Sequence, residues 1–265
     1  MAAAAPVTLA CLEIWGGNKR AARQVNLPGL AGWVSVDPLP GSAAGGDVCY
    51  VSLCGAGQLS RVGVADVSGH GQSVSRVAER LRALMAKHIS TYDQSEMVRE
   101  LNESFQRLEP DAAAGFKFAT VVLLGYLRDT GDFLLTNGGH PAPLRYRAAQ
   151  GRWEYLEESE RNADAANLPL GLIPGTAYRQ LACRLDPGDL ILVYSDGLPE
   201  TPNATGERLE REGLLALAAR LPVTAPEATG HALLAEIEKY RGGGAADDDL
   251  TIVVLQRPAD WCPIA

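Results

Sequence analysis

Positive charge and long apolar runs are both scarce in this sequence. Its 265 residues carry a net charge of −8, which argues against a nucleic-acid partner or an anionic membrane surface, because both need a basic footprint. No apolar run approaches the roughly 20 residues that cross a bilayer, and the N-terminus lacks the basic segment of a signal peptide. We therefore expect no nucleic-acid partner and no membrane partner.

Cysteine and histidine patterns that bind metals or form disulfides are also missing. The five cysteines are scattered, with neither a zinc spacing nor a disulfide framework, which favours a reducing, cytoplasmic location. The four histidines form no cluster of the kind that binds zinc. The sequence therefore predicts a cytoplasmic protein without a zinc site.

Several catalytic signatures are absent as well. There is no Walker A loop and no Gly-x-Gly-x-x-Gly turn after a strand, which disfavours a nucleotide-dependent kinase or a dehydrogenase. No cysteine is followed six positions later by the arginine that a cysteine-based phosphatase needs. Ser68 lacks the Gly-x-Ser-x-Gly pattern of a hydrolase nucleophile, because Asp66 stands two positions before it. Ser68 is therefore interpreted as a turn residue.

What the sequence does contain is a regular series of strands and helices around an apolar core. Runs rich in β-branched and aromatic residues, bounded by turn residues, predict strands at 48–53, 60–66, 118–127, 131–139, 189–197 and 250–257. Apolar residues at three-and-four spacing predict a helix of about 18 residues from position 71. Capping boxes predict two further helix starts, at Asp93 with Glu96 and at Thr224 with Glu227.

The order of these elements indicates an α+β fold. Consecutive strands and consecutive helices favour an antiparallel sheet packed against paired helices, rather than alternating parallel units. Residues 145–183 show only weak patterns and many loop residues, so we expect a surface excursion there, near the functional site.

Acidic residues stand at the ends of four predicted strands, namely Asp47, Asp66, Asp196 and Asp248. A carboxylate at the edge of an apolar sheet is costly without a partner, and no Lys or Arg stands in the immediate sequence neighbourhood of any of the four. One or two hard divalent cations, held by oxygen ligands, would neutralise them. A single strand-end aspartate is more often a turn or cap residue, so this interpretation depends on the four together.

Six stretches of the chain follow one another in an informative order, from about residue 33 to 257. They are "GGD" (45–47), "ADVSGHG" (65–71), "FATVVLLGYLRDTGDFLLTNGGHPAPL" (118–144), "LPLGL" (168–172), "LDPGDLILVYSDGLPET" (185–201) and "DDDLTIVVL" (247–255). Together they resemble the metal-dependent protein phosphatase family (the protein phosphatase 2C superfamily), most closely its bacterial SpoIIE-type branch. The resemblance implies an antiparallel β-sandwich flanked by pairs of antiparallel helices, in α-β-β-α layers.

The same resemblance implies a chemistry and a set of ligands. It implies hydrolysis of phosphoserine or phosphothreonine in proteins by water that two Mn²⁺ or Mg²⁺ ions activate. The aspartates that match the family's metal ligands are Asp47, Asp66, Asp196 and Asp248. Val67 lies where the family offers a backbone carbonyl. Within "DDDLT", Asp249 matches less well than Asp248, and Asp247 less well still.

Other positions keep two interpretations. His70 either donates the proton that a leaving serine alkoxide needs or is a loop residue that fixes the turn. Asn137 and His140 match the family, yet also fit turn hydrogen bonding. Tyr50 stands where many members of the branch have a second acidic residue. No arginine just before Asp47 matches the phosphate-binding arginine of some superfamily members. The basic residues that could serve instead, or be solvated surface, are Lys19, Arg20 and Arg23.

We expect three parts of the chain and one class of partner. Residues 1–32 form an N-terminal extension packed on or regulating the core, 33–258 a SpoIIE-type phosphatase domain, and 259–265 a C-terminal tail. The resemblance implies a phosphorylated STAS-like (anti-anti-sigma) regulatory protein as substrate, with any sensor or activator a separate protein. The alternatives are a pseudophosphatase that acts as a partner-switching binding protein, and a phosphohydrolase of small molecules. The four aspartates favour an enzyme.

Overall fold

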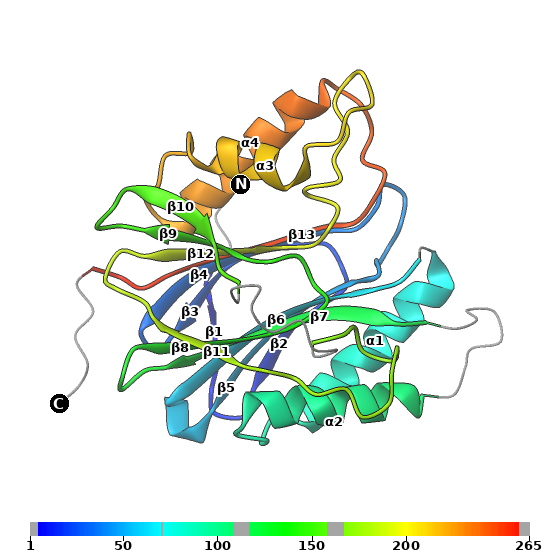
Figure 1. The fold of residues 1–265 in the computed structure, drawn as a ribbon, viewed down its shortest axis with the longest axis vertical. Helices are drawn as coiled ribbons and strands as arrows, with labels where there is room; N and C mark the ends of the chain where they lie inside the picture. The colour runs from blue at the N-terminus through cyan, green and yellow to red at the C-terminus, as the bar shows by residue number, and fades with distance from the viewer. Residues whose placement is uncertain (1–4, 70, 109–116, 158–166, 260–265) are drawn as a thin grey trace.

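Two β-sheets stacked face to face form the centre of the molecule (Figure 1). The computed structural model describes residues 5–69, 71–108, 117–157 and 167–259. The seven-stranded sheet has the order β1 (Val7–Thr8), β3 (Ala21–Leu27), β4 (Leu30–Asp37), β13 (Leu250–Gln256), β12 (Leu190–Tyr194), β9 (Leu144–Arg147) and β10 (Arg152–Tyr155). The six-stranded sheet has the order β11 (Leu181–Arg184), β8 (Asp132–Gly138), β7 (Ala119–Leu127), β6 (Leu59–Val67), β5 (Asp47–Cys54) and β2 (Ile14–Gly17).

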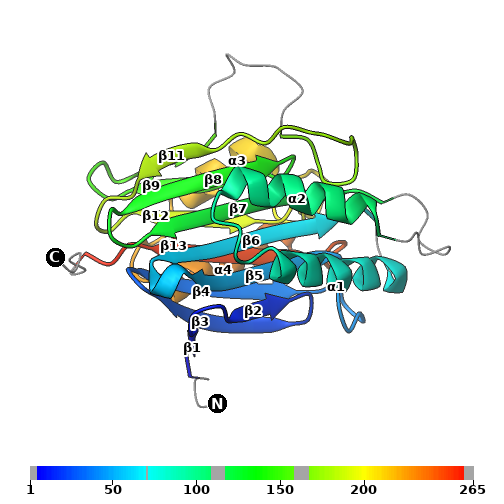
Figure 2. The ribbon, with the colours of Figure 1, turned by 90° about the horizontal axis from the view of Figure 1, so that it is seen from below.

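A pair of helices covers the outer face of each sheet. Helices α1 (Gln72–Lys87) and α2 (Gln94–Gln106) lie across the six-stranded sheet, as Figure 2 shows. Helices α3 (Glu210–Ala218) and α4 (Pro226–Arg241) lie over the seven-stranded sheet. The fold is therefore α+β, in the α-β-β-α layers that the sequence predicts. None of the helices in the described ranges is long and apolar enough to cross a membrane.

Three apolar layers hold these elements together. Residues of both sheets, such as Val64 and Val193, form the layer between the sheets. Leu81 of α1 belongs to the layer under the six-stranded sheet, and Ile237 of α4 to the layer over the seven-stranded one. Each strand of the sandwich centre is therefore buried on both faces, which explains why β5 and β12 are apolar without the alternation of a half-exposed strand.

The strand predictions for the central strands are confirmed, and so is one of the two helix caps. The Asp93 side chain accepts a hydrogen bond from the Glu96 backbone N–H at 2.9 Å and begins α2. The cap predicted at Thr224 is wrong, because α4 begins after Ala225 with no side-chain cap bond. Pro226 stands in the first turn of α4, where its missing N–H removes one of the donors that a cap would satisfy.

Two weakly patterned regions contribute strands. Residues 145–183 are more than a surface excursion, because they contain β10 and β11, the edge strands of the two sheets. Residues 14–27 lie in the predicted N-terminal extension, yet β2 pairs with β5 and β3 pairs with β4. The domain boundary at residue 32 stays a prediction, but strands on both sides of it share the same sheets.

Candidate active site

The first two predicted site residues face each other across the β5–β6 ladder. Asp47 opens β5 and lies directly opposite Asp66 near the end of β6, so their side chains share one face of the sheet. Gly46 packs closely beside them. A Cβ atom on Gly46 would lie 3.1 Å from the Val67 carbonyl oxygen and 3.3 Å from Asp66 Oδ1. These two oxygens therefore border one small space, which a larger residue at position 46 would fill.

The other two predicted site residues come from the second sheet. Asp196 follows β12 and Asp248 precedes β13, and these strands are antiparallel neighbours. Ser195 and Thr251 join the two strand ends, because the Ser195 N–H donates to the Thr251 carbonyl at 3.0 Å and the Thr251 N–H donates to Ser195 Oγ at 2.9 Å. A Cβ atom on Gly197 would lie 3.5 Å from the Asp248 Cβ, so the loop after Asp196 packs against Asp248.

The electrostatics show that the four carboxylates influence one another. Burial, then the charge of Asp66, raises the pKa of Asp47 well above its usual range, although the Ser195 and Thr251 hydroxyls lower it. Burial and the charges of Asp196 and Asp248 raise the pKa of Asp66 to about 7.

The carboxyls from the second sheet are shifted in the same direction. Burial and the neighbouring Asp248 raise the pKa of Asp196 to about 6. Burial also raises the pKa of Asp248. Like charges that each disfavour ionisation of the other are what a group of adjacent carboxylates produces. Asp66 therefore lies within electrostatic reach of each of the other three aspartates that the sequence singles out.

These residues fit a hard cation in chemistry, and their side chains would have to turn to enclose one. Asp47 Oδ2 is buried without a hydrogen-bond partner in the described chain, and no ion pair joins any of the four carboxylates to a described Lys or Arg. Carboxylate and carbonyl oxygens are the donors that Mg²⁺ and Mn²⁺ prefer. However, no three acidic, His or Cys groups among the described residues converge closely enough to surround an ion.

Asp248 and Asp249 have different surroundings. The Asp249 carboxylate accepts the backbone N–H groups of Leu39, at 2.7 Å, and Gly46, at 2.6 Å, so it fastens the 39–46 loop that leads to Asp47. Asp248 Oδ1 accepts only the neighbouring Asp249 N–H, at 2.8 Å, among described donors. Asp248 thus has fewer hydrogen bonds within the described chain than Asp249, and its choice as the metal ligand stays a prediction.

The loop after Asp66 contains Ser68, which the sequence predicts to be a turn residue, and lies near Lys117, which the sequence analysis missed. Ser68 Oγ accepts the Phe118 N–H at 3.2 Å and the Ser68 N–H donates to the Phe118 carbonyl at 3.0 Å, which is the role of a turn residue. Lys117 was missed as a nearby cation, because it is distant in sequence. Its Nζ lies 2.8 Å from the point that a Cβ on Gly69 would occupy. His70, the predicted proton donor, lies outside the described residues.

The remaining candidates divide into buried and exposed groups. Tyr50, which stands where many members of the resembled branch have an acidic residue, is fully buried in the apolar layer under α1. Its side chain therefore contributes to packing. Arg20 forms an ion pair with Asp37, and Arg23 donates to the Ala5 carbonyl at 2.8 Å. Neither arginine is shown to reach the carboxylates. Lys19 follows Asn18, whose Nδ2 donates to the carbonyl of Gly45 at 3.0 Å, two residues before Asp47.

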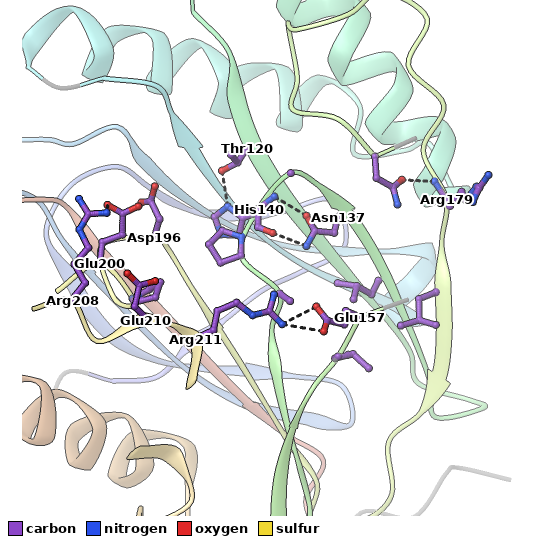
Figure 3. A pocket seen from close by; sticks show the side chains of 18 residues that line it. Thr120, Asn137, His140, Glu157, Arg179, Asp196, Glu200, Arg208, Glu210 and Arg211 are labelled. Carbon is purple, nitrogen blue, oxygen red and sulfur yellow. Dashed lines mark hydrogen bonds and ion pairs between the residues drawn. The ribbon is translucent and has the colours of Figure 1, made fainter. Parts of the chain in front are cut away.

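A cavity of about 600 Å³ opens beside Asp196. Figure 3 shows Asp196, Glu200 and Arg208 on one side and Arg179 on the opposite side, with His140 between them. Glu200 is paired with Arg208 at 2.8 Å. Of the four carboxylates, Asp196 lines this cavity, whose volume is in the range of ligand pockets.

The "NGGHP" turn forms part of the wall of this cavity. The Asn137 side chain brackets the turn, accepting the His140 N–H and donating to the His140 carbonyl, both at 2.8 Å. His140 Nδ1 lies 2.7 Å from Thr120 Oγ1, and Thr120 lies opposite Asp66 in the β6–β7 ladder. Burial lowers the pKa of His140 to about 3, so its ring is neutral at physiological pH. Both turn residues therefore make local hydrogen bonds.

Comparison with known proteins agrees with this geometry. The family model described as Stage II sporulation protein E (SpoIIE) matches residues 57–258. The RsbU and RsbW domains of Rv1364c from Mycobacterium tuberculosis superpose with a TM-score of 0.69 at 25% identity, over 97% of this chain and 64% of that one. The PP2C phosphatase domain of SpoIIE from Bacillus subtilis, with a fragment of its regulatory domain, gives 0.69 at 18% identity, over 94% and 64%.

A further solved structure extends the fold comparison. RsbX in complex with magnesium superposes with a TM-score of 0.63 at 14% identity, over 89% of this chain and 99% of that one. This chain spans 64% of the length of each of the first two structures, which therefore contain regions that it does not match. The matches below 25% identity show a shared fold, and the family model covers well over half of the chain.

Proposed function

This chain belongs to the SpoIIE family of PP2C-type phosphatase domains, and from that premise we propose that it hydrolyses phosphoserine or phosphothreonine on a regulatory protein. The single observation that carries the proposal is the group of four buried or half-buried carboxylates from two sheets, with raised pKa values and no ion pair to a Lys or Arg of the described residues. A fold does not retain such repulsion for stability alone, because each uncompensated charge costs free energy.

The groups that would hold two Mn²⁺ or Mg²⁺ ions are the side chains of Asp47, Asp66, Asp196 and Asp248 and the carbonyl of Val67. When bound, two such ions supply a water of lowered pKa and offset the charge of the phosphoryl oxygens. The solved structure of RsbX contains magnesium, which supports this choice of ion.

Neighbouring residues of this chain hold that arrangement in place. Asp249 fixes the loop before Asp47 through two backbone N–H groups, and Gly46 keeps the space beside Asp66 free. Lys117, beside the Gly69 turn, places a positive charge where a phosphoryl oxygen can approach the loop. No residue of this set needs to become phosphorylated, which agrees with the absence of a hydrolase elbow at Ser68. His70 remains the candidate donor of a proton to the leaving serine oxygen.

The proposed substrate is a phosphorylated STAS-like regulatory protein. Two observations support this substrate. The RsbU and RsbW domains of the similar Mycobacterium structure belong to one protein, and the cavity beside Asp196 is open enough for a protein loop. The alternative is a partner-switching protein that binds such a substrate without turning it over. The uncompensated carboxylates favour the enzyme, because a binding protein gains nothing from them.

Phosphatase assays on purified protein test this proposal. We expect Mn²⁺-dependent hydrolysis of p-nitrophenyl phosphate and of a phosphoserine peptide, and loss of both on adding EDTA. Asp196→Asn should lower the rate roughly a thousandfold, because several kcal/mol of metal-dependent stabilisation are lost. Asp129→Asn, at an exposed turn, is the matched control and should leave the rate unchanged. An unchanged rate in Asp196→Asn, or full activity in EDTA, contradicts the proposal, and metal binding without turnover favours the binding protein.

A further inference from the structure

A groove with basic walls lies beside the candidate active site, along the "WGGNKR" segment (residues 15–20) and helix α1. It consists of two adjoining cavities of about 460 and 520 Å³. Lys19 and Glu79 line both cavities, so the two lie next to each other. We call this feature the basic groove, and its charged lining residues are Lys19, Arg20, Arg76, Glu79 and Arg82.

Hydrogen bonds join the basic groove to the loop that carries Asp47. Asn18 is buried, and its Nδ2 donates to the carbonyls of Gly45 and Ser75, both at 3.0 Å. The Gly45 N–H donates back to the Asn18 carbonyl at 2.9 Å. Gly45 stands two residues before Asp47, and Gly71, which follows the Asp66 loop, lines the same groove. Lys19 therefore directly follows Asn18, the residue that is hydrogen-bonded to the loop before Asp47.

The far end of the basic groove is also fixed. Arg82 Nε donates to the Gly16 carbonyl at 2.7 Å, which ties the middle of α1 to β2. Position 16 accepts only glycine, because its φ is +117° and a Cβ there would lie 2.3 Å from the Cys49 carbonyl oxygen. The backbone of the segment thus sits against β5 while Arg82 is held beside the cavity. The backbone along the groove is thus fixed to α1 and β5, while Lys19 and Arg20 are exposed.

The charge of the basic groove is opposite to that of the whole chain. Its lining contains four basic residues and one acidic residue, and one of the four, Arg20, is paired with Asp37. Lys19 makes no ion pair with a described residue. On a protein of net charge −8, a local positive excess beside the active site attracts and orients acidic groups.

We infer that the basic groove binds acidic residues that flank the phosphoserine of the substrate protein. This inference rests on the proposed phosphatase function and specifies its substrate. Gly71, which follows the Asp66 loop, lines the groove together with Lys19, so the residues that flank a phosphoserine held at Asp66 are the part of the substrate that would meet the groove. Exposed ion pairs of this kind each contribute little alone, and the groove offers several of them to one extended chain.

Binding and turnover of synthetic phosphoserine peptides test the inference separately. Three fluorescent peptides carry Asp and Glu, Asn and Gln, or Lys at the positions flanking phosphoserine. Fluorescence anisotropy measures their dissociation constants, and Mn²⁺-dependent phosphate release measures kcat and KM. The wild-type protein should bind the acidic peptide about tenfold more tightly than the neutral one, with the difference in KM rather than in kcat, and added salt should shrink the preference.

Charge reversal at one wall residue then assigns the preference to the groove. Lys19→Glu should abolish the preference for the acidic peptide over the neutral one and improve binding of the Lys peptide relative to both. Lys239→Glu, an equal change of charge on the exposed face of α4, is the matched control and should keep the wild-type order of peptides.

Each possible result supports or overturns the inference. Equal affinity of wild-type protein for the three peptides overturns it, and so does an unchanged preference in Lys19→Glu. A uniform loss on all substrates, p-nitrophenyl phosphate included, shows a structural role for Lys19 and also overturns it. Absence of all hydrolysis together with charge-dependent binding refutes the proposed phosphatase function but retains the groove as a binding site for acidic phosphopeptides.

Discussion

Two aspartates in the two sheets are equally buried, yet only one of them is neutralised by the fold. Asp189 is 2% exposed and Asp47 is 3% exposed. The Asp189 carboxylate accepts Arg145 Nε at 3.1 Å and its NH2 group at 2.5 Å, and the Ala148 N–H at 2.9 Å. Its charge and its lone pairs are thus satisfied within the chain. Asp47 faces Asp66 instead and has a buried oxygen without a described partner.

The difference distinguishes a buried charge that stabilises the fold, that of Asp189, from one that a bound ligand would neutralise, that of Asp47. A paired charge such as Asp189 and Arg145 is costly to break, because removing one member leaves the other buried alone. An unpaired group of carboxylates is costly to keep, and protonation or a bound cation relieves it. The comparison therefore predicts that replacing Asp by Asn changes the unfolding free energy in opposite directions at the two sites, the Asp189–Arg145 pair and the carboxylate group.

The largest expected effect on stability is at the paired site. Asp189→Asn should lower the unfolding free energy by about 3–5 kcal/mol, because it leaves Arg145 with an uncompensated buried charge. In a domain of this size that is a fall of roughly 10 °C in melting temperature. Thermal unfolding followed by circular dichroism measures it. Asp186→Asn, on the exposed turn just before, is the matched control and should shift stability by less than about 0.5 kcal/mol. If both variants melt like the wild type, the fold does not depend on this ion pair.

A smaller effect of opposite sign is expected at the carboxylate group in metal-free protein. The pKa values of Asp66 and Asp196 are raised to about 7 and about 6 from a usual value of 3.8. Between about pH 4 and 7 the native state therefore holds protons that the unfolded chain has released, so the unfolding free energy falls as pH rises through this window. Asp66→Asn removes one of these charges and should raise the melting temperature in EDTA at pH 7.5 by a few degrees.

Melting curves of wild-type protein and Asp66→Asn at pH 5 and pH 7.5 measure this effect. The gap between the two proteins should widen as pH rises, whereas Asp129→Asn should follow the wild type at both values. A variant that is less stable than the wild type at pH 7.5 would show that Asp66 is a structural residue like Asp189, and the comparison would fail.

The sequence predicts the centre of this fold well, for a physical reason. The central strands are buried on both faces, so their apolar runs are long and unmistakable, as in β7 and β13. The edge strands β10 and β11 have four residues each and are exposed on one side, so their sequences carry little apolar signal. Strand β2 contains two glycines with positive φ, a composition that predicts a turn rather than a strand.

The positions of the site carboxylates were also predictable, whereas the contacts around them were not. Strand-end aspartates are visible in the sequence because turns and apolar runs frame them. The role of Asp249 depends on Leu39 and Gly46, more than 200 residues away. Lys117 reaches Gly69 only because β6 and β7 are paired. Pairing across sheets decides these contacts, and local sequence patterns do not encode it.

The central claim is that the carboxylate group is a metal site and Asp189 is not. Isothermal titration of Mn²⁺ into metal-free protein at pH 7.5 tests it most directly, with wild type, Asp66→Asn and Asp189→Asn compared at a temperature where all three are folded. We expect wild type and Asp189→Asn to bind Mn²⁺ alike, and Asp66→Asn to bind at least tenfold more weakly or not at all. Equal Mn²⁺ binding by Asp66→Asn and the wild type would contradict the account.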